Sequence, residues 1–313
     1  MNRKIIARKT HCQSGLLNVK NPSYAKCVFQ YTFGELVRDD AGRDLTTRAV
    51  FLKTDSARAY VIVKQDGILA GLEETDWFLR KYGKIKCSFV EKDGAKIQAG
   101  NRIMSLSGSV NDLMAVERVI LNLLGRMSGV ATFTKKFVDL ARRSNKNVLI
   151  TPTRKTLWSL LDKKACVLGG GGTHRLSLSN AILIKHNHLK AAGMPINNYL
   201  EKTLHRSTGA KFVEVEVRNA EDALSAAQVF SDFSMRVKTV PCFIMFDNMN
   251  SADVKKALVS IKKSGLHKNV LFEASGRISL STISAFAKTG VDVLSVGEIT
   301  HSAPMLDLSM RMT

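Results

Sequence analysis

The sequence predicts an α/β protein with two domains, a small β-rich domain followed by a parallel sheet arranged as a barrel. Between residues 49 and 108, short stretches of alternating apolar and polar side chains are separated by glycines, as in strands joined by turns. From residue 147 onward, nearly continuous apolar runs alternate with helical stretches, as buried parallel strands alternate with crossover helices. A chain of 313 residues is long enough for both domains.

The first 26 residues are basic and contain no acidic side chain. Transit peptides have this composition, but a disordered or loosely attached extension, or an upstream start codon, also explains it. We expect one of these simpler cases. A helix is predicted for residues 28–39, where apolar side chains recur at helical spacing.

The β-rich domain should contain four strands and one helix. The strands are predicted at residues 60–63, 68–72, 85–90 and 103–106, and the helix at residues 73–82. At residue 111 the apolar pattern changes to helical spacing, which Gly125 and Gly129 interrupt before a second helix begins. We place the boundary between the two domains near this point.

The second domain should contain six strands with helices between several of them. The strands are predicted at residues 148–151, 181–185, 212–217, 243–246, 270–273 and 291–296, and the helices at 221–230, 252–263 and 282–288. Active sites of β/α barrels lie at the carboxyl ends of the strands. The residues at those ends are therefore the candidates for function.

The residues at the ends of these strands are mostly polar, with cations early in the chain and acids later. They are Thr153, Arg154, Lys155, Lys185, His186, Asn187, His188, Glu214, Glu216, Arg218, Asp247, Asn248, Glu273, Ser275, Gly276, Gly297 and Glu298. A glycine-only turn at residues 169–172 leads to His174 and Arg175. This arrangement predicts a pocket for an anionic small molecule.

The residue types indicate two ligands. Arg154, Arg175 and Lys185 fit a molecule that carries carboxylates, because a guanidinium group binds a carboxylate through two parallel hydrogen bonds. Glu216 and Asp247 offer the hard oxygen ligands that hold Mg²⁺ together with phosphate oxygens. The glycine-containing loops after the last strands, with Ser275, Gly276 and Gly297, offer backbone N–H groups to a phosphate.

Individual residues leave alternatives open. Arg154 and Lys155 are equally explained as solvated loop charges, and the glycine turn as tight packing. His186 and His188 would share a strand face and could ligate a metal ion, although the sequence shows no further ligand for it. Lys185 at a barrel strand end is also where an aldolase-like lyase would carry a Schiff-base lysine.

The bulk composition argues against two other classes of protein. The net charge of +20 permits nucleic-acid binding, but the lysines are spread along the chain without an aromatic-and-basic RNA-binding motif. No apolar run approaches the ~20 residues of a membrane helix. The five cysteines form no C-x-x-C pair, which favours reduced thiols in a cytoplasmic protein without a disulfide framework or a zinc site.

Short motifs follow one another in a specific order along the chain. They are Asp44-Leu45-Thr46-Thr47, Gly67-Ile68-Leu69-Ala70-Gly71, Glu117-Arg118, Ser128-Gly129-Val130-Ala131-Thr132, Thr153-Arg154-Lys155-Thr156, His174-Arg175, Leu183-Ile184-Lys185, Glu214-Val215-Glu216-Val217, Asp247-Asn248-Met249, Glu273-Ala274-Ser275-Gly276 and Ser295-Val296-Gly297. Any one motif is weak, but the ordered set resembles the quinolinate phosphoribosyltransferase family (nicotinate-nucleotide pyrophosphorylase, carboxylating) across residues 28–313.

The resemblance implies both a fold and a reaction. After the basic extension (1–26) it implies an N-terminal α/β sandwich domain (27–124), an open, incomplete β/α barrel with the catalytic site (125–298) and a C-terminal segment (299–313) that returns to the first domain. The implied reaction is transfer from phosphoribosyl pyrophosphate (PRPP) to quinolinate with decarboxylation, giving nicotinate mononucleotide for NAD synthesis. Mg²⁺ is the implied cofactor, and the implied assembly is a homodimer or larger oligomer with shared active sites.

The resemblance also assigns residues to each ligand. Those expected around quinolinate are Arg118 of a neighbouring subunit, Thr153, Arg154, His174, Arg175 and Lys185. Those expected around PRPP are Lys155, Glu216, Asp247, Ser275, Gly276, Arg277 and Gly297, with Glu216 and Asp247 also on Mg²⁺. Lys185, Arg154 and Lys155 are the catalytic candidates, and Lys185 is expected to stabilise the carbanion that decarboxylation leaves.

The chain departs from the family pattern in three places. Residues 157–161 form a loop that is shorter than usual after the Thr-Arg-Lys-Thr motif, His186 replaces the usual Asp, and Arg277 replaces a glycine or Asn. A paralogous phosphoribosyltransferase of the same fold with another carboxylate substrate is an alternative, and so is the Schiff-base lyase that would use Lys185.

Overall fold

The computed structural model describes residues 2–207, 209–236 and 240–313. Its contacts divide the chain into two compact units. Unit 1 comprises Met1–Gln13, Lys136–Lys155 and Gly171–Glu298, and unit 2 comprises Ser14–Lys135, Thr156–Gly170 and Ile299–Thr313. The limits expected at residues 26 and 124 fall inside helices, so they are not the limits of these units.

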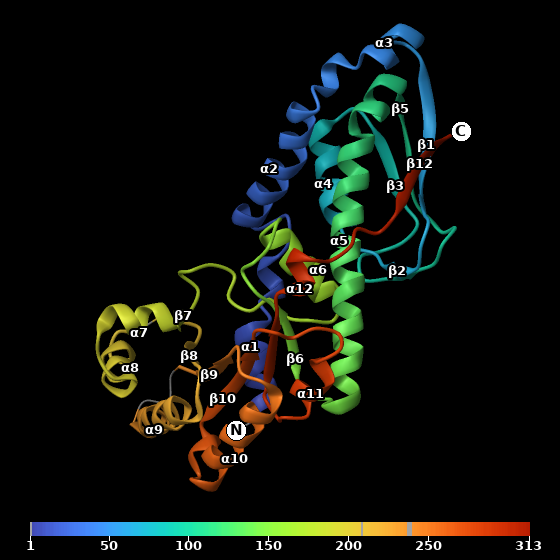
Figure 1. The fold of residues 1–313 in the computed structure, drawn as a ribbon. Coiled ribbons are helices and arrows are strands. Elements are labelled where there is room, and N and C mark those ends of the chain that lie inside the picture. Colours follow the sequence, from blue (N-terminus) through green and yellow to red (C-terminus); the bar gives the residue numbers. More distant parts are fainter. Residues whose placement is uncertain (1, 208, 237–239) are drawn as a thin grey trace. The chain divides into compact units, whose positions relative to one another are not determined.

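Unit 1 is built on a parallel sheet with the strand order β6-β11-β10-β9-β8-β7 (Figure 1). The strands are β6 (Leu149–Pro152), β7 (Ile182–Ile184), β8 (Val213–Val217), β9 (Cys242–Asp247), β10 (Val270–Ser275) and β11 (Val293–Val296). All of them were predicted from apolar runs. Within the described residues, the edge strands β6 and β7 pair with no further strand, so the barrel is open as expected.

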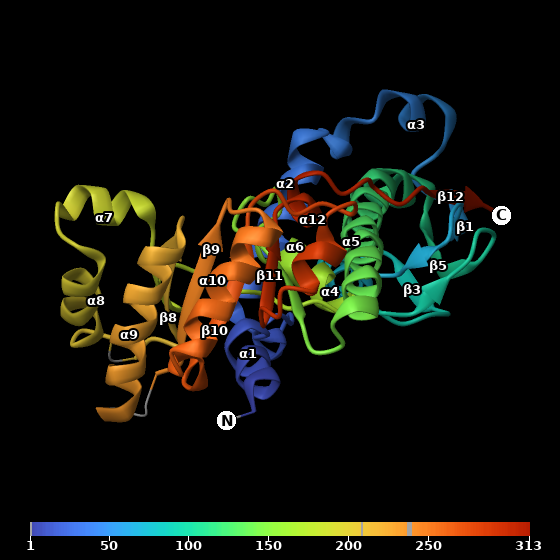
Figure 2. The same ribbon diagram turned by 60° about the horizontal axis from the view of Figure 1, so that its bottom comes forward.

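Helices follow the strands of unit 1. They are α7 (His186–Ala192), α8 (Ile196–Leu204), α9 (Ala220–Arg236), α10 (Ser251–Lys263), the short η3 (Leu266–Lys268) and α11 (Ile283–Ala287). Helices α9, α10 and α11 were predicted, and Figures 1 and 2 show α9 and α10 packed side by side. Helices α7 and α8 were not predicted. Helix α7 is short and has no buried residue, whereas α8 buries Ile196, Leu200 and Leu204 at helical spacing, a signal that the sequence does contain.

The N-terminal residues of unit 1 form helix α1 (Arg3–His11), which corrects the expectation of a disordered or loosely attached extension. Ala7 is buried in a cluster with residues at the amino ends of the strands, namely Leu149, Ala181, Phe212, Phe243, Leu271 and Val293. Arg3 pairs with Asp292 and donates to the Val270 carbonyl at 2.7 Å. Figures 1 and 2 show α1 beside the sheet, where it contacts β6. Its buried stripe (Ala7, Thr10, His11) is too short and too polar for a hydrophobic pattern to reveal.

Unit 2 contains an antiparallel sheet with helices. The sheet has the order β12-β1-β5-β3, with β12 (Leu308–Met312), β1 (Ser56–Val63), β5 (Arg102–Ser109) and β3 (Lys86–Phe89), beside a two-stranded pair of β2 (Gly67–Ile68) and β4 (Lys96–Ile97). The helices are η1 (Ser14–Leu16), α2 (Pro22–Arg38), η2 (Ala41–Arg43), α3 (Leu45–Val50), α4 (Leu72–Tyr82) and α6 (Leu160–Leu168), and α12 (Glu298–His301) precedes β12. The sheet, α4 and the long helix α5 (Val110–Ser144) enclose one apolar core.

Helix α5 (Val110–Ser144) is continuous, so the predicted interruption at Gly125 and Gly129 is wrong. These glycines serve packing instead. A Cβ atom on Gly129 would lie 2.0 Å from the Pro304 carbonyl oxygen, and one on Gly125 would lie 3.0 Å from that of Leu306. They let the C-terminal segment approach the helix backbone, and the length of the helix offsets their low helix propensity.

The short loop after the Thr-Arg-Lys-Thr motif is anchored in unit 2 by Asp162. This buried carboxylate accepts two hydrogen bonds of 2.9 Å from Arg126 and one of 2.5 Å from the Thr156 hydroxyl. The ring of Trp158, in the same loop, lies 3.5 Å from that of Tyr31 on α2. The loop that departs from the family pattern is therefore held by a bidentate ion pair and an aromatic contact.

Candidate active site

One face of the parallel sheet carries a predicted residue at or just after the carboxyl end of each strand. Side chains two apart on a strand share a face, and on this face each strand has an apolar residue at its amino end and a polar residue or a glycine at its carboxyl end. The series are Leu149-Thr151-Thr153, Ala181-Leu183-Lys185, Phe212-Glu214-Glu216, Phe243-Met245-Asp247, Leu271-Glu273-Ser275 and Val293-Ser295-Gly297. The apolar ends pack with Ala7 of α1, which leaves the carboxyl ends for ligands.

The carboxylates at the carboxyl edge are paired with neighbouring cations. The Lys185 ammonium nitrogen lies 3.2 Å from Oε1 of Glu216, and the His186 N–H donates to Oε2 of the same residue at 3.3 Å. Arg218 lies 3.2 Å from Oδ2 of Asp247 on the adjacent strand. A ligand that carries hydroxyls and phosphates can replace one partner of such half-exposed ion pairs. The cost is small, because ion pairs near the surface contribute little free energy to stability.

Arg175 and Arg154 form a concentration of positive charge. Arg175 is only 5% exposed and donates to the Ala181 carbonyl at 3.2 Å, whereas Arg154 is exposed. Burial, together with repulsion from Arg154, lowers the pKa of Arg175. An anion bound here would relieve that repulsion, so the electrostatics favour a carboxylate ligand.

The predicted phosphate loop has a backbone that only some residues tolerate. Gly276 has a φ of +85° and Arg277 a φ of +56°. A Cβ atom on Gly276 would lie 2.3 Å from Oδ1 of Asn248, so this turn requires glycine. Arg277 is exposed, and Ser275 is half-buried beside Asp247 in the strand register. Gly297 occupies the equivalent place after β11.

The remaining predicted residues are more exposed. Lys155 is exposed, and its N–H donates to the Thr153 hydroxyl at 3.1 Å. Arg118 is exposed on the part of α5 that belongs to unit 2. Its role was expected in a neighbouring subunit, so it stays a prediction.

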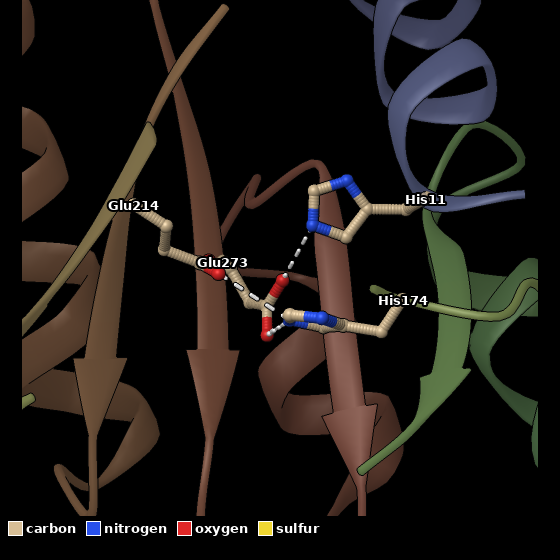
Figure 3. Close-up of side chains that lie close together, drawn as sticks. All are labelled: His11, His174, Glu214 and Glu273. Atoms are coloured by element: carbon tan, nitrogen blue, oxygen red, sulfur yellow. Dashed lines mark ion pairs between the residues drawn. The ribbon is translucent and has the colours of Figure 1, made fainter. Parts of the chain in front are cut away.

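A buried polar cluster beneath this edge was only partly foreseen. His11, His174, Glu214 and Glu273 each contribute an atom to a group in which all atoms lie within 4.8 Å of one another (Figure 3). Nε2 of His174 is 3.3 Å from both Glu214 and Glu273, and Nε2 of His11 is 3.4 Å from Glu273. His11 was missed, because nothing in its local sequence indicates that it meets strands far along the chain.

The charges of this cluster are strongly coupled. Burial opposes ionisation of His174, but the carboxylates of Glu273 and Glu214 outweigh it and raise the His174 pKa to about 9. Burial and the neighbouring Glu273 raise the pKa of Glu214 to about 7. Burial also disfavours the Glu273 carboxylate, but His174 and His11 prevail and hold the Glu273 pKa well below its usual value.

The two histidines considered as metal ligands are placed elsewhere. His186 and His188 belong to helix α7, and Nδ1 of His188 accepts a hydrogen bond of 2.9 Å from the Lys185 N–H. The group of metal-ligating residue types that comes together within the described residues is the buried one of Figure 3.

The fold and sequence match known proteins over both domains. The N-terminal and C-terminal domain models of quinolinate phosphoribosyl transferase match residues 44–128 and 130–311. A probable nicotinate-nucleotide pyrophosphorylase (carboxylating) of Methanothermobacter thermautotrophicus is 34% identical over 281 residues, 89% of this chain and 96% of that protein. Quinolinate phosphoribosyltransferase (decarboxylating) 1 of Nicotiana glauca is 31% identical over 98% of this chain and 88% of its own.

A solved structure agrees with these matches. The nicotinate-nucleotide pyrophosphorylase from Francisella tularensis superimposes with a TM-score of 0.80 at 32% identity, over 92% of this chain and 96% of that one. Both domains and their order are therefore shared. This chain belongs to the quinolinate phosphoribosyltransferase family.

Proposed function

We propose that this protein joins quinolinate to PRPP with loss of CO₂, giving nicotinate mononucleotide and pyrophosphate for NAD synthesis. The observation that carries the proposal is the set of cations and carboxylates at the carboxyl edge of one sheet face, in a chain of this family. Arginines suit the two carboxylates of quinolinate, and the acids suit the ribose hydroxyls of PRPP.

In the first step the pyridine nitrogen of quinolinate attacks the anomeric carbon of PRPP. The new N–C bond forms as the C–O bond to pyrophosphate breaks, through an oxocarbenium-like state. The protein has to hold two polyanions together against their repulsion. Arg154 and Arg175 would receive the quinolinate carboxylates, with Arg118 of a second subunit, and Lys155 would lie beside the leaving pyrophosphate.

In the second step the bond between C2 of the pyridine ring and its carboxylate breaks. CO₂ leaves, the electron pair stays on C2, and a proton then replaces the carboxylate there. Lys185 carries its ammonium group at the end of β7, 3.2 Å from Glu216. We assign it the stabilisation of this electron pair, because a cation close to a developing negative charge lowers the barrier.

The PRPP end of the site would be held by the acids and the phosphate loop. Glu216 and Asp247 end adjacent strands, with side chains 12% and 15% exposed, and their oxygens fit both the ribose hydroxyls and Mg²⁺. When bound, Mg²⁺ supplies charge neutralisation of the pyrophosphate. Ser275, Gly276, Arg277 and Gly297 would hold the 5′-phosphate.

We also propose a homodimer with shared sites. Exposed apolar side chains gather on α2, α3 and the residues after α3, with Val37 81%, Leu45 79% and Leu52 71% exposed. They adjoin a groove of about 1490 Å³ lined by Phe29, Val37 and Phe51 among others. Contiguous apolar surface of this kind is typical of an interface. A second copy of the chain as its occupant also accounts for the exposed Arg118.

An assay with quinolinate, PRPP and Mg²⁺ tests the activity. Pyrophosphate and CO₂ should appear in equal amounts, EDTA should stop both, and nicotinate should not replace quinolinate. Turnover of another carboxylate without CO₂ would favour the paralogue instead. The His186 replacement makes that comparison necessary, because it removes the negative charge of the usual Asp next to Lys185. A borohydride-trapped adduct on Lys185 without PRPP dependence would favour the lyase.

Within the described residues, no helix combines the length and apolar character needed to cross a bilayer.

A further inference from the structure

The end of helix α1 holds the loop that carries His174 and Arg175. The His11 carbonyl accepts hydrogen bonds from the Thr173 N–H at 2.6 Å and the His174 N–H at 3.1 Å. A Cβ atom on Gly172 would lie 2.4 Å from this carbonyl oxygen, so the last glycine of the glycine-only turn makes room for it. The loop backbone is thus built around the end of α1.

The other end of the same loop is held by Gln13. Its side-chain amide exchanges two hydrogen bonds with that of Asn180, of 2.5 and 2.9 Å, and Asn180 in turn accepts one from the Leu176 N–H. The Gln13 N–H donates to the Thr173 hydroxyl at 3.1 Å. Residues 11–13 therefore contact both ends of the segment 172–180.

The His11 side chain continues this connection inside the sheet. Its ring stacks on Phe212 at 4.2 Å and meets the edge of His174 at 4.7 Å. Its Nε2 lies 3.4 Å from Oε2 of Glu273, whose Oε1 lies 3.3 Å from Nε2 of His174 and accepts from Ser295 at 2.5 Å. Figure 3 shows Glu273 between the two histidines.

Contacts on both nitrogens fix the orientation of the His174 ring. Its Nδ1 lies 2.7 Å from the backbone nitrogen of Arg175. Its Nε2 lies 3.3 Å from both Glu214 and Glu273 and donates a hydrogen to these carboxylates. The His174 side chain, 7% exposed, thus connects Glu214 and Glu273 to the backbone of Arg175.

We propose that His11 is a positioning residue for Arg175, acting through Glu273 and His174. Helix α1 lies outside the residues 44–128 and 130–311 that the family's domain models match. In this chain, α1 thereby becomes part of the quinolinate site without contacting the substrate. The inference rests on the proposed function and deepens it, because it names what holds the buried arginine in register with the quinolinate carboxylates.

Two substitutions of His11 distinguish the effect of its polar contact with Glu273 from the effect of its ring packing. His11→Phe keeps the ring stacked on Phe212 but removes the Nε2 contact to Glu273, whereas His11→Gln keeps a donor near that place and loses the ring. Lys9→Ala, on the exposed face of the same helix, is the matched control. Ile261→Ala, a buried residue of α10, controls for general loss of stability.

Kinetics of the full chain give the first test. We expect His11→Phe to raise the KM for quinolinate about tenfold, the effect of one charge-assisted hydrogen bond, with the KM for PRPP nearly unchanged. His11→Gln should restore most of the affinity, and both controls should match the wild type. Equal damage by Gln and Phe, or an equal rise in the KM for PRPP, overturns the proposal.

Hydrogen exchange gives a second test that needs no substrate. The Thr173 and His174 amides should exchange about tenfold faster in His11→Phe than in wild type and Lys9→Ala, since a loosened loop opens more often. Unchanged exchange overturns the proposal, as does a stoichiometric transition metal in the purified wild type. Faster exchange in a protein that does not turn over quinolinate leaves the link standing and rejects only the proposed function.

Discussion

The two arginines at the carboxyl edge differ in burial, and this difference sets how much each can contribute to binding. Arg175 is 5% exposed and Arg154 is exposed. A hydrogen bond between charged partners gains strength where water is excluded, so the buried arginine should contribute more. Removing its charge also leaves a buried carboxylate of the ligand without a partner.

We therefore expect Arg175→Ala to raise the KM for quinolinate about 10–100-fold, from the loss of about 1.5–3 kcal/mol, and Arg154→Ala to raise it less. The KM for PRPP should change little in both. Steady-state kinetics at saturating co-substrate measure this. Lys255→Ala on α10, an exposed lysine, is the control. If both variants weaken only PRPP, the division of the pocket is wrong.

The buried Glu214 should make stability depend on pH. Its pKa in the folded protein, about 7, lies above the ordinary 4.5, so folding favours the protonated carboxyl group. This contribution is complete below about pH 4.5 and is lost as the pH rises through about 7. The Tm of the wild type should thus fall relative to that of Glu214→Gln over this window. Calorimetry at a series of pH values measures it, and parallel curves would contradict the assignment.

At the scale of elements, the six parallel strands were predictable because strands buried on both faces are continuous apolar runs. Helix α5 was not, because a glycine in a helix has the same signature as a break. The structure distinguishes the two cases through the carbonyl groups that approach Gly125 and Gly129. Helix α1 escaped prediction because most of its residues are polar and only three are buried.

Substitution of glycine by alanine should change the free energy of unfolding differently at two positions with different surroundings. Gly129→Ala should lower the free energy of unfolding by about 1–3 kcal/mol, because its Cβ would overlap the Pro304 carbonyl. Gly34→Ala in α2 should raise it by about 0.5–1 kcal/mol, since nothing lies within 4 Å of the new Cβ and alanine favours a helix. Urea denaturation compares the two. A neutral Gly129→Ala would show that the C-terminal segment can move away freely.

The loop at residues 156–161 depends on one buried ion pair. Asp162→Ala leaves the Arg126 guanidinium, 6% exposed, without its bidentate partner. We expect a loss of about 3–5 kcal/mol, as for other buried pairs that lose one member. Asp76→Ala breaks an exposed pair with Arg80 and should matter little. Denaturant titration of both variants is the measurement, and equal effects would argue against a structural role for Asp162.

At the scale of the whole molecule, active sites that are shared between two subunits predict that two inactive variants restore activity when they form mixed dimers. Arg118→Ala and Lys185→Ala subunits, unfolded and refolded together, should regain about a quarter of the wild-type sites. Half of the twofold dimers are then hybrids, and each hybrid has one intact site. Activity of the mixture against each variant alone measures this. No recovery in a mixture that forms hybrids would place Arg118 and Lys185 in the same subunit's site or exclude Arg118 from it.

The sequence by itself determined the order of the strands along the chain, the carboxyl edge of the sheet as the place of Lys185, Glu216 and Asp247, and the family. These properties depend on local periodicity and on ordered motifs, which are readable from neighbouring residues. Only the tertiary structure decided that His11 joins Glu273 and His174, that Gly172 admits the end of α1, and that His174 turns inward. Such contacts join residues distant in the chain, and packing selects them without leaving a local pattern.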